Sequence, residues 1–259
     1  MNNFQNLFRK IFLLSIIFIF NQATMNAQTV SPVKDIVIVH GAFADGSGWE
    51  AVYNILKERG YNVTVVQNPL SSLEDDVEAT NRAIDRKAGK VVLVGHSWGG
   101  TVITQAGVNP KVANLVYVAA FAPGMGQSTL DLVKTAPPAA ENGILPPDEK
   151  GIIYYDKAKF HAGFCADVPK EKAAFMYDSQ GPINVKCFIT PVSQTAWKSK
   201  PSFAILSTDD KSINPDIQRA MYKNAGSKVT EIKGSHAIYV SKPKAVADVI
   251  ELAAKDASK

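Results

Sequence analysis

The sequence lacks three features that would each have pointed to a particular partner or fold. Its 28 basic and 24 acidic residues are interspersed, with no basic stripe or block, which argues against a nucleic-acid partner. It contains neither the G-x-G-x-x-G pattern nor the lysine of a Walker loop, which argues against a phosphate-binding site. It also has no internal repeat or low-complexity tract. With 46% hydrophobic and 20% charged residues, it has the composition of an ordinary globular protein.

The longest apolar run is too short to cross a bilayer. Residues 11–20 are mostly apolar, but they are about half of the roughly 20 residues that a membrane-spanning helix needs. Arg9 and Lys10 precede this run and Ala27 follows it, a pattern typical of a secretory signal peptide over residues 1–27. Met25 fits the cleavage-site preference for small residues poorly, so the exact cleaved bond stays open. We expect a secreted or periplasmic protein without a stable membrane anchor after cleavage.

Cysteine is almost absent. Cys165 and Cys187 are the only two, so a single disulfide is possible, and an exported chain would meet oxidising conditions in which it can persist. Sequence spacing says nothing about the geometry that a disulfide needs, and two separate buried thiols are an equal alternative. Neither a metal site nor an organic cofactor is expected.

From residue 34 onward, short β-branched runs alternate with longer amphipathic segments, which predicts a βαβ series. Gly60 and Gly89 stand at expected helix ends, and Ser71 or Ser72 can cap the acidic start of the second helix. The expected fold is α/β, with a mostly parallel, roughly six-stranded sheet flanked by helices. The expected strands are residues 35–40, 61–66, 90–95, 112–120, 202–207 and 228–232, and the expected helices are residues 48–60, 72–89, 99–108, 215–225 and 243–255.

The alternation stops after Ala120, where a stretch rich in proline and glycine leads into aromatic, helix-permissive sequence. The strand pattern returns only at residue 202. We therefore predict an inserted, mainly helical cap at about residues 123–198, within one domain that spans residues 28–259.

Residues 91–100, VVLVGHSWGG, contain the pattern G-x-S-x-G between an apolar strand and a helix. A serine on such a tight turn projects above the sheet, and Gly95 and Gly99 remove Cβ atoms that would collide with the neighbouring strand and helix. The amides at the start of the helix favour developing negative charge. Ser97 is therefore the predicted nucleophile, although the bare pattern also fits an ordinary Gly-rich turn.

A serine nucleophile needs a base, and a histidine oriented by an acid supplies one near neutral pH. Among four histidines, His236 follows the last expected strand, in a loop at the same sheet edge as Ser97. Asp209 and Asp210 follow the preceding strand, so the chain order Ser, Asp, His is satisfied. Only one of the two can orient the histidine, and capping or a turn is the alternative role for either.

Cleavage of an ester through this serine also needs two amide donors for the oxyanion. One is expected from the residue after the nucleophile and one from the loop after the first strand, HGAFADGSGW. Trp98 and Ala42 are the predicted donors, with Phe43 as the fallback. The alternative for this loop is a plain β-to-α turn.

Four segments together, VIVHGAFADGSGW, LVGHSWGG, STDDKSINP and KGSHAIYVSKP, resemble the α/β-hydrolase fold superfamily over nearly all of residues 34–255. The chain is similar in particular to small esterases related to plant methylesterases and hydroxynitrile lyases. In that branch the acid stands five residues before the proline of the following helix, which maps onto Asp210. The lyases have a threonine and a lysine where this sequence has Gly41 and Ala237, so the resemblance favours hydrolysis over cyanohydrin cleavage.

The resemblance also implies that the cap covers Ser97 and shapes the acyl and alcohol pockets. Aromatic side chains are the candidates for lining these pockets, although packing of the cap against the sheet is their commoner role. The candidates are Phe43, Phe160, Phe164, Phe175, Tyr177 and Trp197.

We therefore expect an exported serine hydrolase that cleaves small carboxylic esters through Ser97, His236 and Asp210 and needs no cofactor. Two alternatives remain. One is a lyase or a cofactor-free oxidative enzyme that uses the same triad. The other is a non-catalytic binder of a small apolar ligand. The natural substrate and the oligomeric state are left open.

Overall fold

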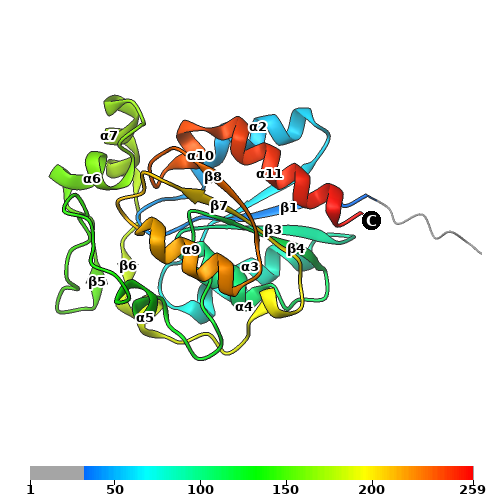
Figure 1. The fold of residues 1–259 in the computed structure, drawn as a ribbon, viewed down its shortest axis with the longest axis horizontal. Coiled ribbons are helices and arrows are strands. Elements are labelled where there is room, and N and C mark those ends of the chain that lie inside the picture. Colours follow the sequence, from blue (N-terminus) through cyan, green and yellow to red (C-terminus); the bar gives the residue numbers. More distant parts are fainter. Residues whose placement is uncertain (1–31, 259) are drawn as a thin grey trace, which may run out of the picture. The chain divides into compact units, whose positions relative to one another are not determined.

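A six-stranded parallel sheet forms the centre of residues 32–258, the residues that the computed structural model describes (Figure 1). The strand order is β2-β1-β3-β4-β7-β8, and every neighbouring pair is parallel. The strands are β1 (Asp35–Val39), β2 (Asn62–Val66), β3 (Val91–His96), β4 (Val112–Val118), β7 (Ser202–Ser207) and β8 (Lys228–Ile232). This sheet confirms the predicted fold class. The predicted signal peptide, residues 1–27, lies outside the described residues.

Helices cover both faces of the sheet (Figure 1). One face carries α2 (Glu50–Glu58) and α11 (Pro243–Asp256), and the other carries α3 (Leu73–Asp85), α4 (Trp98–Ala106) and α9 (Pro215–Asn224). Ser72 begins α3 by accepting a hydrogen bond from the Asp75 amide, as an N-cap serine does. Helix α3 ends at Asp85 rather than near Gly89, because Arg86 caps it and the Lys87 amide turns back to the Ile84 carbonyl.

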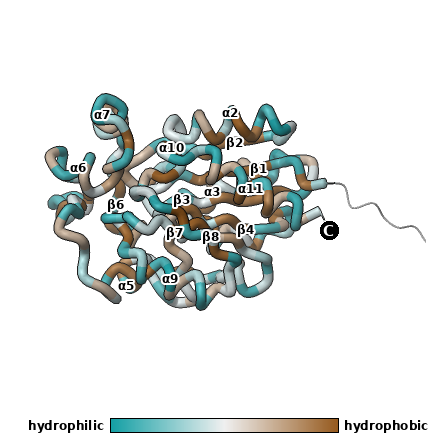
Figure 2. The backbone as a smooth tube through the Cα atoms, turned by 45° about the horizontal axis from the view of Figure 1, so that its top comes forward, coloured by the Kyte–Doolittle hydropathy of each residue, from teal (hydrophilic) through white to brown (hydrophobic). Residues whose placement is uncertain are grey.

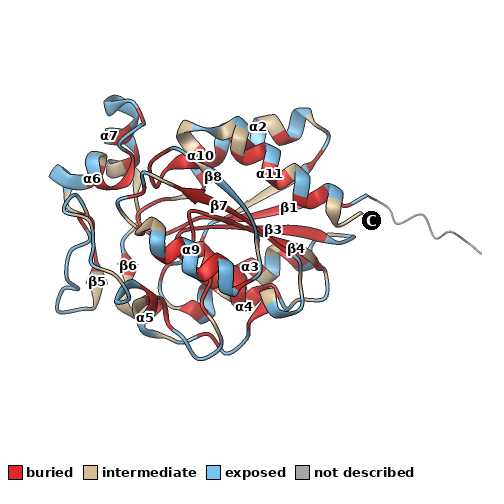
Figure 3. Ribbon diagram, viewed as in Figure 1, coloured by how far each residue is buried: buried red, intermediate tan, exposed pale blue. Residues whose placement is uncertain are grey.

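The core lies along the middle strands, where hydrophobic and buried residues coincide (Figures 2 and 3). All residues of β3 are buried, because strands flank it on both sides and helices cover both faces. The edge strand β8 is mostly exposed and carries Lys228 and Glu231, charged residues that discourage edge-to-edge pairing.

The order of the strands creates a crevice. The chain runs from β1 outward to β2 and then returns to pair β3 on the other side of β1. Val39 at the end of β1 is level with Gly95 near the end of β3, so the loops after these two strands meet at one edge. Ligands of open α/β sheets bind at such a switch point, beyond the carboxyl ends of the strands.

The segment between β4 and β7 forms the inserted cap. Four short helices and a small antiparallel sheet make up its regular part, whereas residues 134–151 are largely irregular. The small sheet was not predicted, because each of its strands has only two residues. The elements of the cap are α5 (Thr129–Val133), β5 (Ile152–Ile153), α6 (Lys157–Phe164), α7 (Lys170–Ser179), β6 (Ile183–Asn184), α8 (Val185–Ile189) and the 3-10 turn η2 (Ala196–Lys198).

Cys165 and Cys187 are both buried and both free. In this structure they form no disulfide and pack as two separate small apolar side chains. Burial raises the pKa of the Cys165 thiol to about 12, so this thiol stays protonated. Over residues 32–258, no helix is long and apolar enough to span a membrane, and no group of three or more His, Cys, Asp or Glu side chains is arranged to hold a metal ion.

Candidate active site

Ser97 occupies a strained turn between β3 and α4. Its backbone has φ 53° and ψ −122°, a left-handed conformation that is rare for a residue other than glycine. A Cβ atom at Gly95 would collide with the Gly99 carbonyl, and one at Gly99 would collide with the Val39 carbonyl of β1. Both glycines are thus required by the close approach of α4 to β1 and β3, as the sequence predicts. The turn lifts the Ser97 side chain to the wall of a pocket above the sheet.

His236 and Asp210 form a buried pair. The His236 Nδ1 atom lies 2.7 Å from the Asp210 Oδ2 atom, and the residues are 1% and 3% exposed. Asp210 follows β7, and His236 lies in the loop between β8 and the short helix α10 (Ile238–Ser241). Asp209, the alternative acid, has an exposed side chain, and its backbone amide donates a hydrogen bond to the Gly234 carbonyl. The structure therefore places Asp210, and not Asp209, against the histidine.

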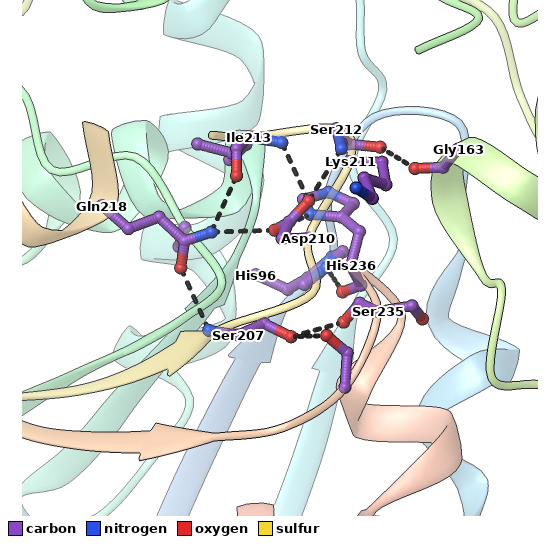
Figure 4. A network of polar contacts seen from close by, with 12 residues as sticks. His96, Gly163, Ser207, Asp210, Lys211, Ser212, Ile213, Gln218, Ser235 and His236 are labelled. Carbon is purple, nitrogen blue, oxygen red and sulfur yellow. Dashed lines mark hydrogen bonds and ion pairs between the residues drawn. The ribbon is translucent and has the colours of Figure 1, made fainter. Parts of the chain in front are cut away.

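Three further donors fix the Asp210 carboxylate (Figure 4). The Ser212 and Ile213 amides donate to Oδ1 at 2.8 and 2.9 Å. The side chain of Gln218, on α9, donates to Oδ2 at 2.9 Å and also to the Ile213 carbonyl. The sequence analysis missed Gln218, because nothing in its spacing distinguishes it from any other glutamine on an amphipathic helix. These bonds hold the carboxylate turned toward His236.

The ring nitrogens of the other three histidines contact backbone groups and not Asp210. Burial lowers the pKa of His40, whose Nδ1 lies 2.8 Å from the Gly41 carbonyl oxygen and whose Nε2 accepts a hydrogen bond from the Asn68 amide. Burial likewise lowers the pKa of His96, so its ring is neutral. His161 lies in the cap and contacts the Val168 carbonyl.

The backbone amides of the two predicted oxyanion donors, Trp98 and Ala42, are free to bind an oxyanion. Trp98 is the first residue of α4, and the first amide of a helix has no acceptor within the helix. Over the described part of the chain, the Ala42 and Phe43 amides donate to no backbone or side-chain acceptor. Ala42 and Phe43 both line the same pocket as Ser97 and His236, and Phe43 has φ 56°. Within residues 32–258, the loop after β1 therefore has two unpaired amides, either of which can serve as the second oxyanion donor.

The pocket above Ser97 has a volume of about 460 Å³. His236 and Tyr155 are its only titratable lining residues within the described chain, and no charged side chain of Asp, Glu, Lys or Arg lines it. The apolar wall comes mainly from the cap and the start of α9: Phe121, Leu130, Val133, Ala136, Pro137, Pro138, Ile144, Leu145, Pro147, Ile153, Phe164, Val185, Phe188, Ile189, Ile213 and Ile217. Such a wall suits an uncharged, apolar ligand.

Two of the six predicted lining residues, Phe43 and Phe164, do line this pocket. The other four do not. The Phe160 ring stacks on Phe164 at 4.9 Å, and Tyr177 packs edge-on against Phe160. Phe175 is 61% exposed, and the Trp197 indole donates to the Pro123 carbonyl. These four aromatic side chains therefore belong to the packing or the surface of the cap.

Comparison with known proteins gives relatives that align over most of this chain. The pyrethroid hydrolase of Sphingobium wenxiniae is 30% identical over 245 residues, which cover 84% of this chain and 86% of that protein. Putative methylesterase 14, chloroplastic, of Arabidopsis thaliana is 26% identical, with 84% and 71% of the two chains covered. The crystal structure of a pyrethroid hydrolase from Sphingobium faniae JZ-2 superposes with a TM-score of 0.73 at 25% identity, covering 86% of this chain and 97% of that one.

These similarities agree with the resemblance to small esterases related to plant methylesterases. The profile of the alpha/beta hydrolase family matches residues 36–249, a range that contains Ser97, Asp210 and His236 together with the whole cap. The chain therefore belongs to the alpha/beta hydrolase family.

Proposed function

We propose that the protein is an exported serine esterase that cleaves uncharged carboxylic esters with apolar groups. The observation that carries this proposal is the pairing of His236 with Asp210 at the wall of the pocket that also exposes Ser97. Relatives that are named hydrolases and methylesterases support hydrolysis of an ester. The signal-peptide pattern of residues 1–27 supports export.

In this proposal the Ser97 hydroxyl attacks the ester carbonyl carbon while the His236 Nε2 atom accepts its proton. Asp210 holds the Nδ1 proton and so fixes the tautomer and the direction of the imidazole. The carbonyl oxygen gains negative charge and is stabilised by the Trp98 and Ala42 amides. His236 then gives its proton to the leaving alcohol, which departs and leaves an acyl group on Ser97. A water molecule, activated by His236, releases the acid by the same steps in reverse order.

The lining of the pocket sets the expected substrate class. An anionic or cationic substrate would lose its hydration without gaining an oppositely charged partner, because no ionic side chain lines the pocket within residues 32–258. Cyanohydrin cleavage needs a cation near the leaving cyanide. No Lys or Arg side chain is among these lining residues, so the lining disfavours that reaction. We infer that neutral esters are preferred on both the acyl and the alcohol side.

The test is hydrolysis of 4-nitrophenyl esters from acetate to dodecanoate by the purified protein, with Ser97→Ala as the control. We expect Ser97→Ala to fold normally and to lose about a million-fold in kcat. The matched pair 4-nitrophenyl butyrate and mono-4-nitrophenyl succinate tests the substrate class, because the two differ mainly by one carboxylate. Activity that survives Ser97→Ala would disprove the mechanism, and equal kcat/KM for the two esters would disprove the preference for neutral substrates.

A further inference from the structure

Asp76 is a second buried carboxylate near Ser97, and the proposed triad does not use it. It lies on α3 and is 0% exposed. Its two oxygens each accept one hydrogen bond: Oδ1 from the Leu70 amide at 2.8 Å and Oδ2 from the Trp98 indole Nε1 at 2.7 Å. A buried carboxylate is costly to folding unless its hydrogen bonds are satisfied. A neutral acceptor would satisfy an indole at less cost, so the position of this charge needs an explanation.

Trp98 links Asp76 to the active site. The residue follows Ser97 directly, and its backbone amide is one of the two expected oxyanion donors. Its side chain is fully buried, with the indole nitrogen on Asp76 and the ring edge-on to Phe188 at 5.8 Å. Phe188 lines the pocket. The indole is therefore held between the carboxylate of α3 and the wall of the pocket.

Leu70 links Asp76 to the cap. Its backbone is left-handed, with φ 56°, and its amide donates to Asp76. Its carbonyl accepts a hydrogen bond from the Asn184 amide at 2.9 Å, and Asn184 is the N-cap of α8, the helix that carries Phe188. One carboxylate thus joins the loop before α3, the first residue of α4 and, through Leu70, the start of α8.

We propose that Asp76 is a positioning residue of this active site: acting through the Trp98 indole, its carboxylate fixes the Trp98 amide as an oxyanion donor and Phe188 as part of the pocket wall. The proposal rests on the proposed function, because it assigns a role within the same reaction. Asp76 touches neither the substrate nor the reacting atoms. Its effect is on the geometry of the transition state, where a displacement of one donor is costly.

The charge of Asp76 responds to pH in a range where the enzyme can be assayed. Burial raises the pKa of Asp76 to about 6, against the two hydrogen bonds that lower it, and Asp75 on the same helix adds a further rise. Cys187 faces Asp76 from α8, and burial raises the pKa of its thiol so far that it stays neutral. Acidification below the pKa of Asp76 therefore protonates it and weakens its bond to the indole.

The activity test is a double-mutant cycle with Asp76→Asn and Trp98→Phe, assayed on the best neutral ester at pH 8. Asparagine keeps the size of the side chain and offers only one acceptor oxygen to two donors. We expect Asp76→Asn to lower kcat about 10- to 100-fold with a much smaller change in KM, below the loss for removing an oxyanion donor outright. We also expect little further loss from Asp76→Asn in the Trp98→Phe background, because the effect acts through the indole. Glu74→Gln, an exposed carboxylate on the same helix, is the control and should leave kcat unchanged.

A spectroscopic readout tests the pair without using activity. The indole ¹H–¹⁵N resonance of Trp98, assigned by its absence in Trp98→Phe, should shift with an apparent pKa near 6, and this shift should vanish in Asp76→Asn. An unchanged kcat in Asp76→Asn, or losses that add up in the double variant, would overturn the proposal. If Asp76→Asn does not fold, an indole resonance of the wild-type protein that ignores pH would overturn it. A wild-type protein without Ser97-dependent ester hydrolysis would instead disprove the proposed function, and the indole titration would still show whether the pair exists.

Discussion

His96 and His236 lie ring against ring, with centroids 4.6 Å apart, and the His96 Nε2 atom lies 3.0 Å from the backbone carbonyl oxygen of His236. Because burial lowers the pKa of His96, the ring is neutral, and its single N–H must be on Nε2 to donate to this carbonyl. His96, the residue just before Ser97, therefore fixes the backbone of His236 through this hydrogen bond.

Replacement of His96 by phenylalanine should keep the ring packing but leave the His236 carbonyl without its donor. We expect a loss of about 1–3 kcal/mol in unfolding free energy and a fall of roughly tenfold in kcat, since about 1.4 kcal/mol of transition-state stabilisation corresponds to that factor. His161→Phe is the matched control, because His161 also contacts a backbone carbonyl but lies in the cap. Equal losses of kcat in the two variants would contradict a role for His96 in positioning the base.

Asp210→Asn should lower kcat by about 10⁴-fold while the protein stays folded, because a neutral amide does not stabilise the imidazolium and its NH2 group favours the wrong tautomer of His236. Circular dichroism and steady-state kinetics measure the two effects. Asp209→Asn is the control, since Asp209 is exposed and should be replaceable without loss. A large loss in Asp209→Asn with activity retained in Asp210→Asn would reverse the assignment of the acid.

The uncharged pocket predicts that one new charge at its mouth changes substrate preference. Ile189 lines the pocket and is 49% exposed, so Ile189→Lys can place an ammonium near a bound substrate without burying it. At a distance of about 8 Å and an effective dielectric constant of about 20, the attraction to an anionic ester is roughly 2 kcal/mol. We expect kcat/KM for mono-4-nitrophenyl succinate, relative to 4-nitrophenyl butyrate, to rise at least about tenfold. Val108→Lys, at an exposed position outside the pocket, should leave this ratio unchanged; a rise there too would mean that the lining does not select the charge.

Asp76 also predicts how stability depends on pH. The pKa of Asp76 is about 6 in the folded protein and about 3.9 in an unfolded chain. Between these values the folded state holds the proton and the unfolded state does not, so the contribution of Asp76 to stability falls as pH rises from about 4 to about 6 and is constant above. The wild type should lose up to about 3 kcal/mol relative to Asp76→Asn over this window. Urea unfolding of both proteins at several pH values measures it, and a difference that does not vary with pH would contradict the raised pKa.

The sequence predicts the sheet and the positions of Ser97, Asp210 and His236 because each lies in the loop or turn that follows a strand. In a parallel sheet the ends of the strands meet at one edge, so residues far apart in the chain are brought together by the fold itself. Gly95 and Gly99 are predictable for a related reason, since a tight strand-to-helix turn leaves no space for a Cβ atom at either position.

The pocket lining could not be predicted in this way. Residues 134–151 have no hydrophobic periodicity, and their place above Ser97 depends on how the irregular chain packs. Phe160 and Tyr177 look like pocket residues by composition but fill the interior of the cap. Gln218 and Asp76 lie on amphipathic helices, and only their neighbours in space distinguish them from other polar residues on the same helices.

The origin of the pocket wall has a consequence for how the substrate range of this protein can evolve. Most of the pocket wall comes from the insertion between β4 and β7, whereas the reacting groups come from the ends of the sheet strands. Substitutions at wall positions such as Pro138, Leu145 and Ile189 therefore alter which molecule fits without moving the reacting groups. Mutant libraries confined to residues 130–147 therefore sample new specificities while Ser97, Asp210 and His236 stay in place, and this separation lets selection on substrate range proceed largely independently of selection on chemistry.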